Sequence, residues 1–314
     1  MSNSSNKKIK TISRQQKRLL FCILMLIWPI LQITICYVMV NANSFILAFQ
    51  EYSMSAGNLG YTIKFAGFAN FKQAWGILHN CGYMIENSFN LFLVRTFVGI
   101  TLALLFSFYI YKKWMLSGLF KVVLFMPQII SGLIFSLLFK YIVTDVYSSL
   151  VLKISGKQVL GLLDNTKTRM LTIIIYNVWI GFGTNVLLFS GSMSAIDCSV
   201  VEASHIDGAN LLQEFVYITL PMIFETLSQF LIVGIAAIFT DQMCLISLYG
   251  MNANEVASLG YYMYKLTYSG NYIADGQTYS FSVISALGLI LTVIVMPVVL
   301  GIKKLLAKYG PSDR

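Results

Sequence analysis

Six long apolar runs are the feature that most limits how this chain of 314 residues can fold. An α-helix rises about 1.5 Å per residue, so about 20 residues cross a hydrocarbon layer about 30 Å thick. The runs approach or exceed that length and lie at about 19–40, 87–111, 119–139, 171–190, 222–248 and 281–302. We therefore predict an all-α integral membrane protein with six transmembrane helices.

The composition agrees with a membrane protein. Hydrophobic residues make up 57% of the chain and charged residues only 11%, against about 25% charged in an ordinary soluble domain. So few charges exclude an ordinary cytosolic enzyme, and the high hydrophobicity excludes a disordered chain. The first run has 22 residues, more than the about 7–15 of a signal peptide's apolar region, so we expect it to be retained as a helix.

The basic residues indicate the orientation of the chain. Six precede the first run, three belong to the connection between the second and third, and four follow the sixth. If both termini lie inside the cell, these 13 of the 22 basic residues all belong to cytoplasmic segments. The net charge of +9 is then a topology signal and not a nucleic-acid footprint. The expected parts are a basic cytoplasmic N-terminus 1–18, a helix 19–40, an extracytoplasmic loop 41–86, a five-helix core 87–302 and a basic cytoplasmic tail 303–314.

The chain carries no recognisable catalytic or metal-binding pattern. Its five cysteines are odd in number and none form a CxxC pair, so neither a zinc site nor a disulfide framework is expected. Residues 161–168 come close to a phosphate-binding loop, but Thr166 replaces the second glycine and the segment is expected outside the cell. We expect no ATP site, no metal and no bound cofactor on this chain.

The segment 191–221, between the fourth and fifth runs, has a pattern of short helices. Ser199 followed by Glu202 is a capping-box pattern that starts a helix at about residue 200. Gly208 is suited to end it in a left-handed conformation, and Asn210 can cap a second short helix running to about residue 217. Pro221 can open the next membrane helix, where its missing N–H costs little.

This helical hairpin also lacks basic residues. No Lys or Arg occurs between Gly191 and Pro221. Helices that lie on an inner membrane leaflet favour basic faces, which argues against a membrane-surface role. An apolar hairpin with few charges suits insertion into the groove of a partner protein.

At these residues the chain resembles a known family. The matching residues are Glu202, Ala203, Ser204, Asp207, Gly208, Ala209, Ile218, Thr219, Leu220 and Pro221. This pattern is similar to the EAA loop of binding-protein-dependent ABC importer permeases, and most similar to the carbohydrate permeases of the maltose and glycerol-phosphate group. The spacings of six residues from Glu202 to Gly208 and thirteen from Gly208 to Pro221 are those of the family.

The chain also departs from the family pattern. Asp197 stands where proline is usual and Ser204 where alanine is usual. His205, Glu214, Val216 and Tyr217 occupy positions that are often basic or polar. These differences concern which ATPase the loop would meet, and how tightly.

The resemblance implies a six-helix type I ABC importer permease whose loop couples it to an ATPase. Glu202, Ala203, Ser204, Asp207, Gly208, Ala209 and Pro221 would form the coupling site. The implied partners are a second, homologous permease, two cytoplasmic ATPase subunits that hold ATP and magnesium, an extracytoplasmic solute-binding protein and membrane lipid. The implied solute is a sugar or oligosaccharide. Alternatives are a permease of the same superfamily for a polyamine, phosphate or peptide, and a secondary transporter.

Polar residues inside the apolar runs are candidates for a translocation path. Arg95 and Asp241 each lie about 12 Å from the outer end of their runs at about 1.5 Å per residue, so we hypothesise that they pair or line one cavity. Gln128, Asn177 and Asn185 could bind the hydroxyl groups of a sugar, and ordinary interhelical hydrogen bonding is the alternative for each.

Overall fold

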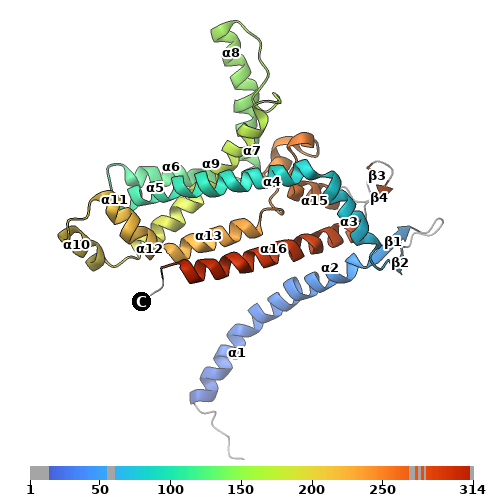
Figure 1. Ribbon diagram of the computed structural model, residues 1–314, viewed down its shortest axis with the longest axis horizontal. Coiled ribbons are helices and arrows are strands. Elements are labelled where there is room, and N and C mark those ends of the chain that lie inside the picture. Colours follow the sequence, from blue (N-terminus) through green and yellow to red (C-terminus); the bar gives the residue numbers. More distant parts are fainter. Residues whose placement is uncertain (1–13, 55–60, 269–272, 275–276, 279–280, 312–314) are drawn as a thin grey trace, which may run out of the picture.

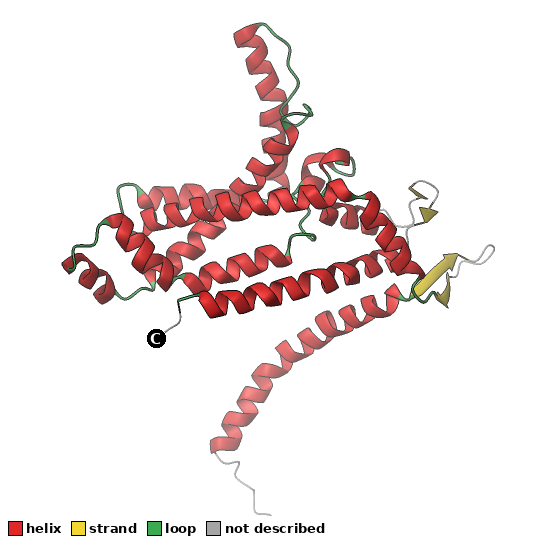
Figure 2. Cartoon of the chain, in the orientation of Figure 1, coloured by secondary structure: helices red, strands yellow, loops and turns green. Residues whose placement is uncertain are grey.

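The computed structural model describes residues 14–54, 61–268, 273–274, 277–278 and 281–311. It is a bundle of long helices with two small strand pairs at one end (Figures 1 and 2). In this part of the chain, five helices are long and apolar enough to cross a membrane, and a bent pair makes six if it crosses as one span. The predicted helical membrane bundle is therefore confirmed. Residues 1–13 of the expected basic N-terminus and 312–314 of the expected tail lie outside the described residues.

The two ends of the bundle differ, and we name them by what they carry (Figure 1). The strand end carries β1 to β4, and the hairpin end carries α10 and the last described residues. The first span is one continuous helix made of α1 (Arg14–Ile33), η1 (Thr34–Met39) and α2 (Val40–Ala48). It diverges from the bundle toward the hairpin end, and no residue of its most apolar stretch is buried.

The centre of the bundle is built from two long spans. They are α4 (Gly82–Val94), η2 (Arg95–Gly99) and α5 (Ile100–Tyr111) for the one, and α9 (Arg169–Ser194) for the other. α5 and α6 (Ser117–Ile129) both pack along α9. A methyl group on Gly183 of α9 would collide with the backbone carbonyl of Leu124 in α6, so only glycine permits this close approach.

The third predicted run, 119–139, is not one straight helix. α6 ends at Ile129, two residues after Pro127, and Ile130 and Ser131 are not helical. Pro127 lacks the N–H that would bind the carbonyl of Val123, and its ring crowds that carbonyl, so it weakens the last turns of α6. The chain then continues through α7 (Gly132–Tyr141), η3 (Ile142–Val146) and α8 (Tyr147–Ser155), which point away from the bundle (Figure 1).

The fifth predicted run, 222–248, is also broken, which corrects its expected length. α13 spans only Phe224–Ala236, and α14 (Leu245–Tyr249) follows an irregular segment. In that segment the Asp241 carboxylate accepts the N–H of Met243 at 2.9 Å, and Met243 and Cys244 both have positive φ. A carboxylate that binds the backbone two residues on offers the chain an alternative to helix.

The strand end is closed by short elements. They are β1 (Gln50–Met54) paired antiparallel with β2 (Tyr61–Phe65), α3 (Ala69–Asn80), η5 (Asn254–Val256), α15 (Leu259–Tyr268), and β3 (Ile273–Ala274) paired with β4 (Gln277–Thr278). The buried Asn70 amide donates to the carbonyls of Ala48 and Gln50, both at 2.9 Å, which ties α3 to the end of the first span. The last span, α16 (Phe281–Tyr309), packs against α2, α3 and α13.

Candidate functional site

The hairpin at 197–222 folds much as its sequence predicts. α10 spans Cys198–Ile206, Gly208 has φ +80, and Asn210 forms a capping box with Gln213. The second arm is α11 (Leu211–Gln213), η4 (Glu214–Thr219) and α12 (Leu220–Met222), which form one helix. The turn at Gly208 and the cap at Asn210 are therefore confirmed.

Two details of the hairpin differ from expectation. The cap of α10 is Asp197 and not Ser199, because the Asp197 carboxylate accepts the backbone N–H of Ser199 at 2.9 Å. That bond holds the pKa of Asp197 below its ordinary value. Pro221 does not open the next membrane helix, because the break comes at Ile223 and the helices on its two sides are bent by 68°.

The surface of the hairpin is available to a partner. Glu202, Ala203, Asp207 and Gly208 are exposed, whereas Ser204 is buried. Apolar side chains are also exposed there, with Ile206 at 86% and Leu212 at 73%. Exposed apolar surface of this kind, beside an exposed carboxylate, is typical of an interaction site.

The base of the hairpin holds an ion-pair cluster that the sequence analysis did not identify. Glu214, only 1% exposed, pairs with Lys112 at the end of α5, and His205 of α10 lies 3.1 Å from its other carboxylate oxygen. The Lys112 ammonium also lies 5.6 Å from the centre of the Phe108 ring. The sequence singled out Glu214 only because it departs from the family pattern. A sequence signal did exist: Glu214 lies in a segment without Lys or Arg, so a charged partner had to come from elsewhere in the chain.

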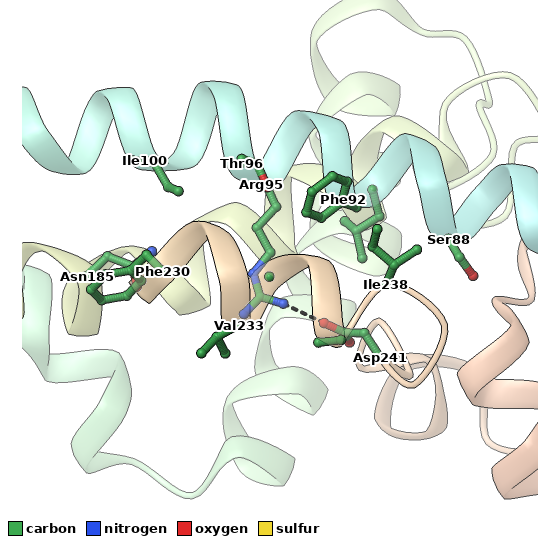
Figure 3. A pocket seen from close by; sticks show the side chains of 13 residues that line it. Ser88, Phe92, Arg95, Thr96, Ile100, Asn185, Phe230, Val233, Ile238 and Asp241 are labelled. Carbon is green, nitrogen blue, oxygen red and sulfur yellow. Dashed lines mark hydrogen bonds and ion pairs between the residues drawn. The ribbon is translucent and has the colours of Figure 1, made fainter. Parts of the chain in front are cut away.

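A second ion pair lies inside the bundle, in a cavity of about 160 Å³ between α4–η2–α5, α9 and α13 (Figure 3). The Arg95 guanidinium and the Asp241 carboxylate point toward each other and pair. Their side chains are 48% and 28% exposed. Phe92, Phe230 and Asn185 are among the other residues that line the cavity. The expected association of Arg95 with Asp241 is confirmed.

The position of this pair differs from expectation. The helix of Arg95 begins at Gly82 and not at residue 87, so Arg95 lies 13 residues, or about 20 Å, from its start and near the middle of the span. Asp241 is not on a helix but in the irregular segment after α13. An arginine at this depth is costly to hold in a membrane, and a carboxylate partner reduces that cost.

The other candidates for the path separate into two groups. Asn185 lines the cavity. Asn177 is buried elsewhere and donates to the carbonyls of Ile173 and Met243, both at 2.9 Å. Gln128 donates to the carbonyl of Ile180 and does not line the cavity either. Gln128 thus makes the interhelical hydrogen bond that was the alternative to a path role, and Asn177 binds its own helix and the irregular segment after α13.

A further cavity, of about 700 Å³, lies between α13 and the end of α16 at the hairpin end. Glu225, Gln229 and Lys303 line it, together with Val233. Val233 also lines the cavity of Arg95, so one face of α13 borders both spaces. Among the described residues, no group of three His, Cys, Asp or Glu side chains is placed to hold a metal ion.

Comparison with known proteins adds family information to this geometry. Residues 96–308 match the model of a family described as the inner membrane component of binding-protein-dependent transport systems. The chain is 28% identical over 221 residues to the lactose transport system permease protein LacF of Rhizobium radiobacter, covering 67% of this chain and 72% of LacF. It is 28% identical over 257 residues to the multiple sugar-binding transport system permease protein MsmF of Streptococcus mutans, covering 79% and 83%.

The fold is also similar to a solved structure. A chain of a bacterial alginate ABC transporter, crystallised in complex with a periplasmic protein bound to an alginate pentasaccharide, superposes with a TM-score of 0.75. The match covers 94% of this chain and 96% of that chain at 18% sequence identity. At this identity the comparison shows a shared fold.

Proposed function

Because the chain belongs to the family of binding-protein-dependent transport system inner membrane components, we propose that it is the permease subunit of an ATP-driven importer of a sugar or oligosaccharide. The chain would not hydrolyse ATP itself. It would work beside a second, homologous permease, with two cytoplasmic ATPase subunits and an extracytoplasmic solute-binding protein. The proposal places both termini and the hairpin inside the cell and the strand end outside.

The observation that carries this proposal is the hairpin 197–222. It presents the exposed carboxylate of Glu202 and the exposed apolar side chains of Ile206 and Leu212 on two short helices joined by a left-handed glycine. The loop has no Lys or Arg that could neutralise Glu202. A carboxylate that becomes buried needs a positive partner, so an ATPase cleft that receives α10 would supply a basic group. Closure of the ATPase pair would then move the membrane helices between inward- and outward-facing arrangements.

The two cavities along α13 support a solute path through this subunit. The cavity of Arg95 and Asp241 lies near the middle of the second span, and the cavity of Glu225 and Gln229 lies at the hairpin end. Val233 borders both, so small changes in the tilt of α13 would open one toward the other. The first cavity has a volume of about 160 Å³, whereas ligand sites typically have about 300 Å³ or more. A smaller volume is expected if a second permease completes the site.

The substrate class is supported by two arguments. The similar LacF and MsmF are named as lactose and multiple-sugar permeases. The charges of Arg95 and Asp241 cancel in the central cavity, whereas a polyamine would favour surplus carboxylates and a phosphate would favour surplus cations. Paired charges beside Phe92 and Phe230 suit the hydroxyl groups and apolar face of a neutral sugar.

Reconstitution tests the proposal. The permease pair, its ATPases and its binding protein would be placed in liposomes, and uptake of labelled sugars, a polyamine, phosphate and a peptide would be measured. We expect sugar uptake that requires both ATP and the binding protein. Uptake of one of the other solutes instead would contradict the sugar assignment, and uptake driven by an ion gradient without ATP would identify a secondary transporter.

A further inference from the structure

Glu214 is unusual among the charged residues of this protein. In the part of the chain that the structure describes, it is the one buried side chain that carries a formal charge, at 1% exposed. Its position near the base of the hairpin is not in the surface that would meet an ATPase. A buried carboxylate destabilises a fold unless positive groups and hydrogen bonds compensate it, so its retention at this place calls for a physical role.

Glu214 and its two partners come from three different parts of the chain. Glu214 itself begins η4, in the second arm of the hairpin. Lys112, 16% exposed, follows the last residue of α5, and His205 lies in α10, the first arm. The carboxylate therefore joins both arms of the hairpin to the end of the second span.

Aromatic packing strengthens the same joint. The rings of Phe108 in α5 and Phe215 in η4 lie 4.9 Å apart. The Lys112 ammonium lies 5.6 Å from the centre of the Phe108 ring and 5.7 Å from that of Tyr111, within the range of cation–π attraction. With so little solvent around it, this ion pair is weakly screened, and separating it would leave an uncompensated charge. The hairpin and α5 are thus expected to move as one body.

The second span carries that movement to the central cavity. α5 packs along α9 and continues through η2, which holds Arg95. We propose that Glu214 is a positioning residue that locks the coupling hairpin to α5 through Lys112, so that displacement of the hairpin by the ATPase becomes displacement of the second span. This inference rests on the proposed importer function and names the residues that transmit the motion within it.

The test removes the lock without leaving an orphan charge. In the double variant Lys112→Met with Glu214→Gln, both charges disappear together, so the fold is spared an unpaired buried charge. Lys112→Arg keeps the charge and is the conservative variant, and Lys113→Met, at an exposed neighbour, is the matched control. The reconstituted importer is measured for ATPase co-purification, ATP hydrolysis and sugar transported per ATP.

We expect the double variant to retain its ATPase subunits and to transport about tenfold less sugar per ATP than the wild type. Lys112→Arg should stay within about threefold of wild type, and Lys113→Met should not differ from it. An assembled double variant that transports as much sugar per ATP as the wild type would overturn the lock. Loss of ATPase binding in the wild-type complex would instead overturn the proposed function.

A distance measurement tests the lock even if the double variant does not fold. Spin labels are attached to the native Cys198 of α10 and to Lys113→Cys after α5, with the other exposed cysteines, Cys22 and Cys36, replaced by serine. The assembled importer keeps Lys112 and Glu214, and the distance is measured with and without ATP. We expect the label separation to stay constant to within about 2 Å through the cycle. A change several times larger would show that the hairpin moves independently of α5 and would overturn the proposal.

Discussion

Two of the ion-pair sites among the described residues, Arg95–Asp241 and Lys112–Glu214, use the same chemistry in opposite surroundings. Arg95 and Asp241 pair in a cavity with 48% and 28% of their side chains exposed, near the middle of a span. Lys112 and Glu214 pair at the hairpin end with 16% and 1% exposed. The first pair has room for water or a solute beside it, and the second is enclosed by protein.

This difference indicates different tasks. A pair that water reaches can exchange its partner for the hydroxyl groups of a passing solute at modest cost, because solvent screens the separated charges. A pair enclosed by protein strongly resists separation, so it holds its two elements in one arrangement. The open pair is suited to the path and the enclosed pair to the joint between the hairpin and the spans.

The largest stability effect is expected from Lys112→Met alone. It leaves the carboxylate of Glu214 buried with only His205 beside it, which should cost about 3–5 kcal/mol of unfolding free energy. Thermal unfolding of the purified protein in detergent measures the loss, with the exposed Lys113→Met as control. A melting temperature for Lys112→Met equal to that of the control would contradict the view that the Lys112–Glu214 pair resists separation more strongly than the Arg95–Asp241 pair.

Charge reversal at the open pair should affect transport more than stability. Asp241→Lys places two positive charges in the central cavity that both residues line. We expect sugar uptake to fall at least tenfold while the protein remains folded and bound to its ATPases. The exchanged pair Arg95→Asp with Asp241→Arg should recover part of the uptake. Unchanged folding together with unchanged uptake in Asp241→Lys would remove this pair from the path.

A smaller effect on stability and on ATPase binding is expected from substitutions at Gly208, in the turn of the hairpin. Gly208 has φ +80, and a Cβ atom added there would meet no other group within 4 Å. Gly208→Val should therefore cost about 1–2 kcal/mol through backbone strain alone and reduce ATPase co-purification. Gly208→Asn is the matched variant, because asparagine tolerates this conformation better. Equal ATPase recovery for valine, asparagine and glycine would show that the turn is not constrained.

The smallest effect is expected at the cap of α10. The bond from the Ser199 N–H lowers the pKa of Asp197, so the carboxylate stabilises the folded hairpin above the ordinary pKa of about 4, and this contribution is lost as the pH falls through the lowered value. Asp197→Ala should weaken α10 near neutral pH, and Asp197→Asn should keep the cap but lose the pH dependence. Hydrogen exchange of the α10 amides in the three proteins measures this. Identical protection in all three would contradict a capping role.

The sequence predicted local features better than distant contacts. Gly208 and Asn210 were identified because turn and cap preferences act within a few residues, and the Arg95–Asp241 pair was expected because charges in apolar runs need partners. The break after Ala236 was missed, because apolar content does not reveal where a backbone leaves the helix.

Apart from the Arg95–Asp241 pair, the long-range partners could not be predicted from the sequence, for a similar reason. The link from Glu214 to Lys112 depends on the packing of the hairpin against α5, which no short-range pattern encodes. Asn177 was a path candidate as a polar residue in a span, but its amide binds the carbonyl of Met243, in a segment expected to be helical. A polar residue that hydrogen-bonds an irregular stretch of backbone looks the same in sequence as one that faces a translocation path. The two can be distinguished only when the course of that backbone is known.

The most direct test of the account is whether the hairpin binds the ATPase through Glu202. The exposed Glu202 is replaced by arginine, which reverses its charge without a buried contact to disturb in this chain, and ATPase co-purification and sugar uptake are measured on the same membranes. The account predicts that both fall at least tenfold while the permease remains folded. Normal ATPase recovery together with normal uptake would contradict coupling through this hairpin.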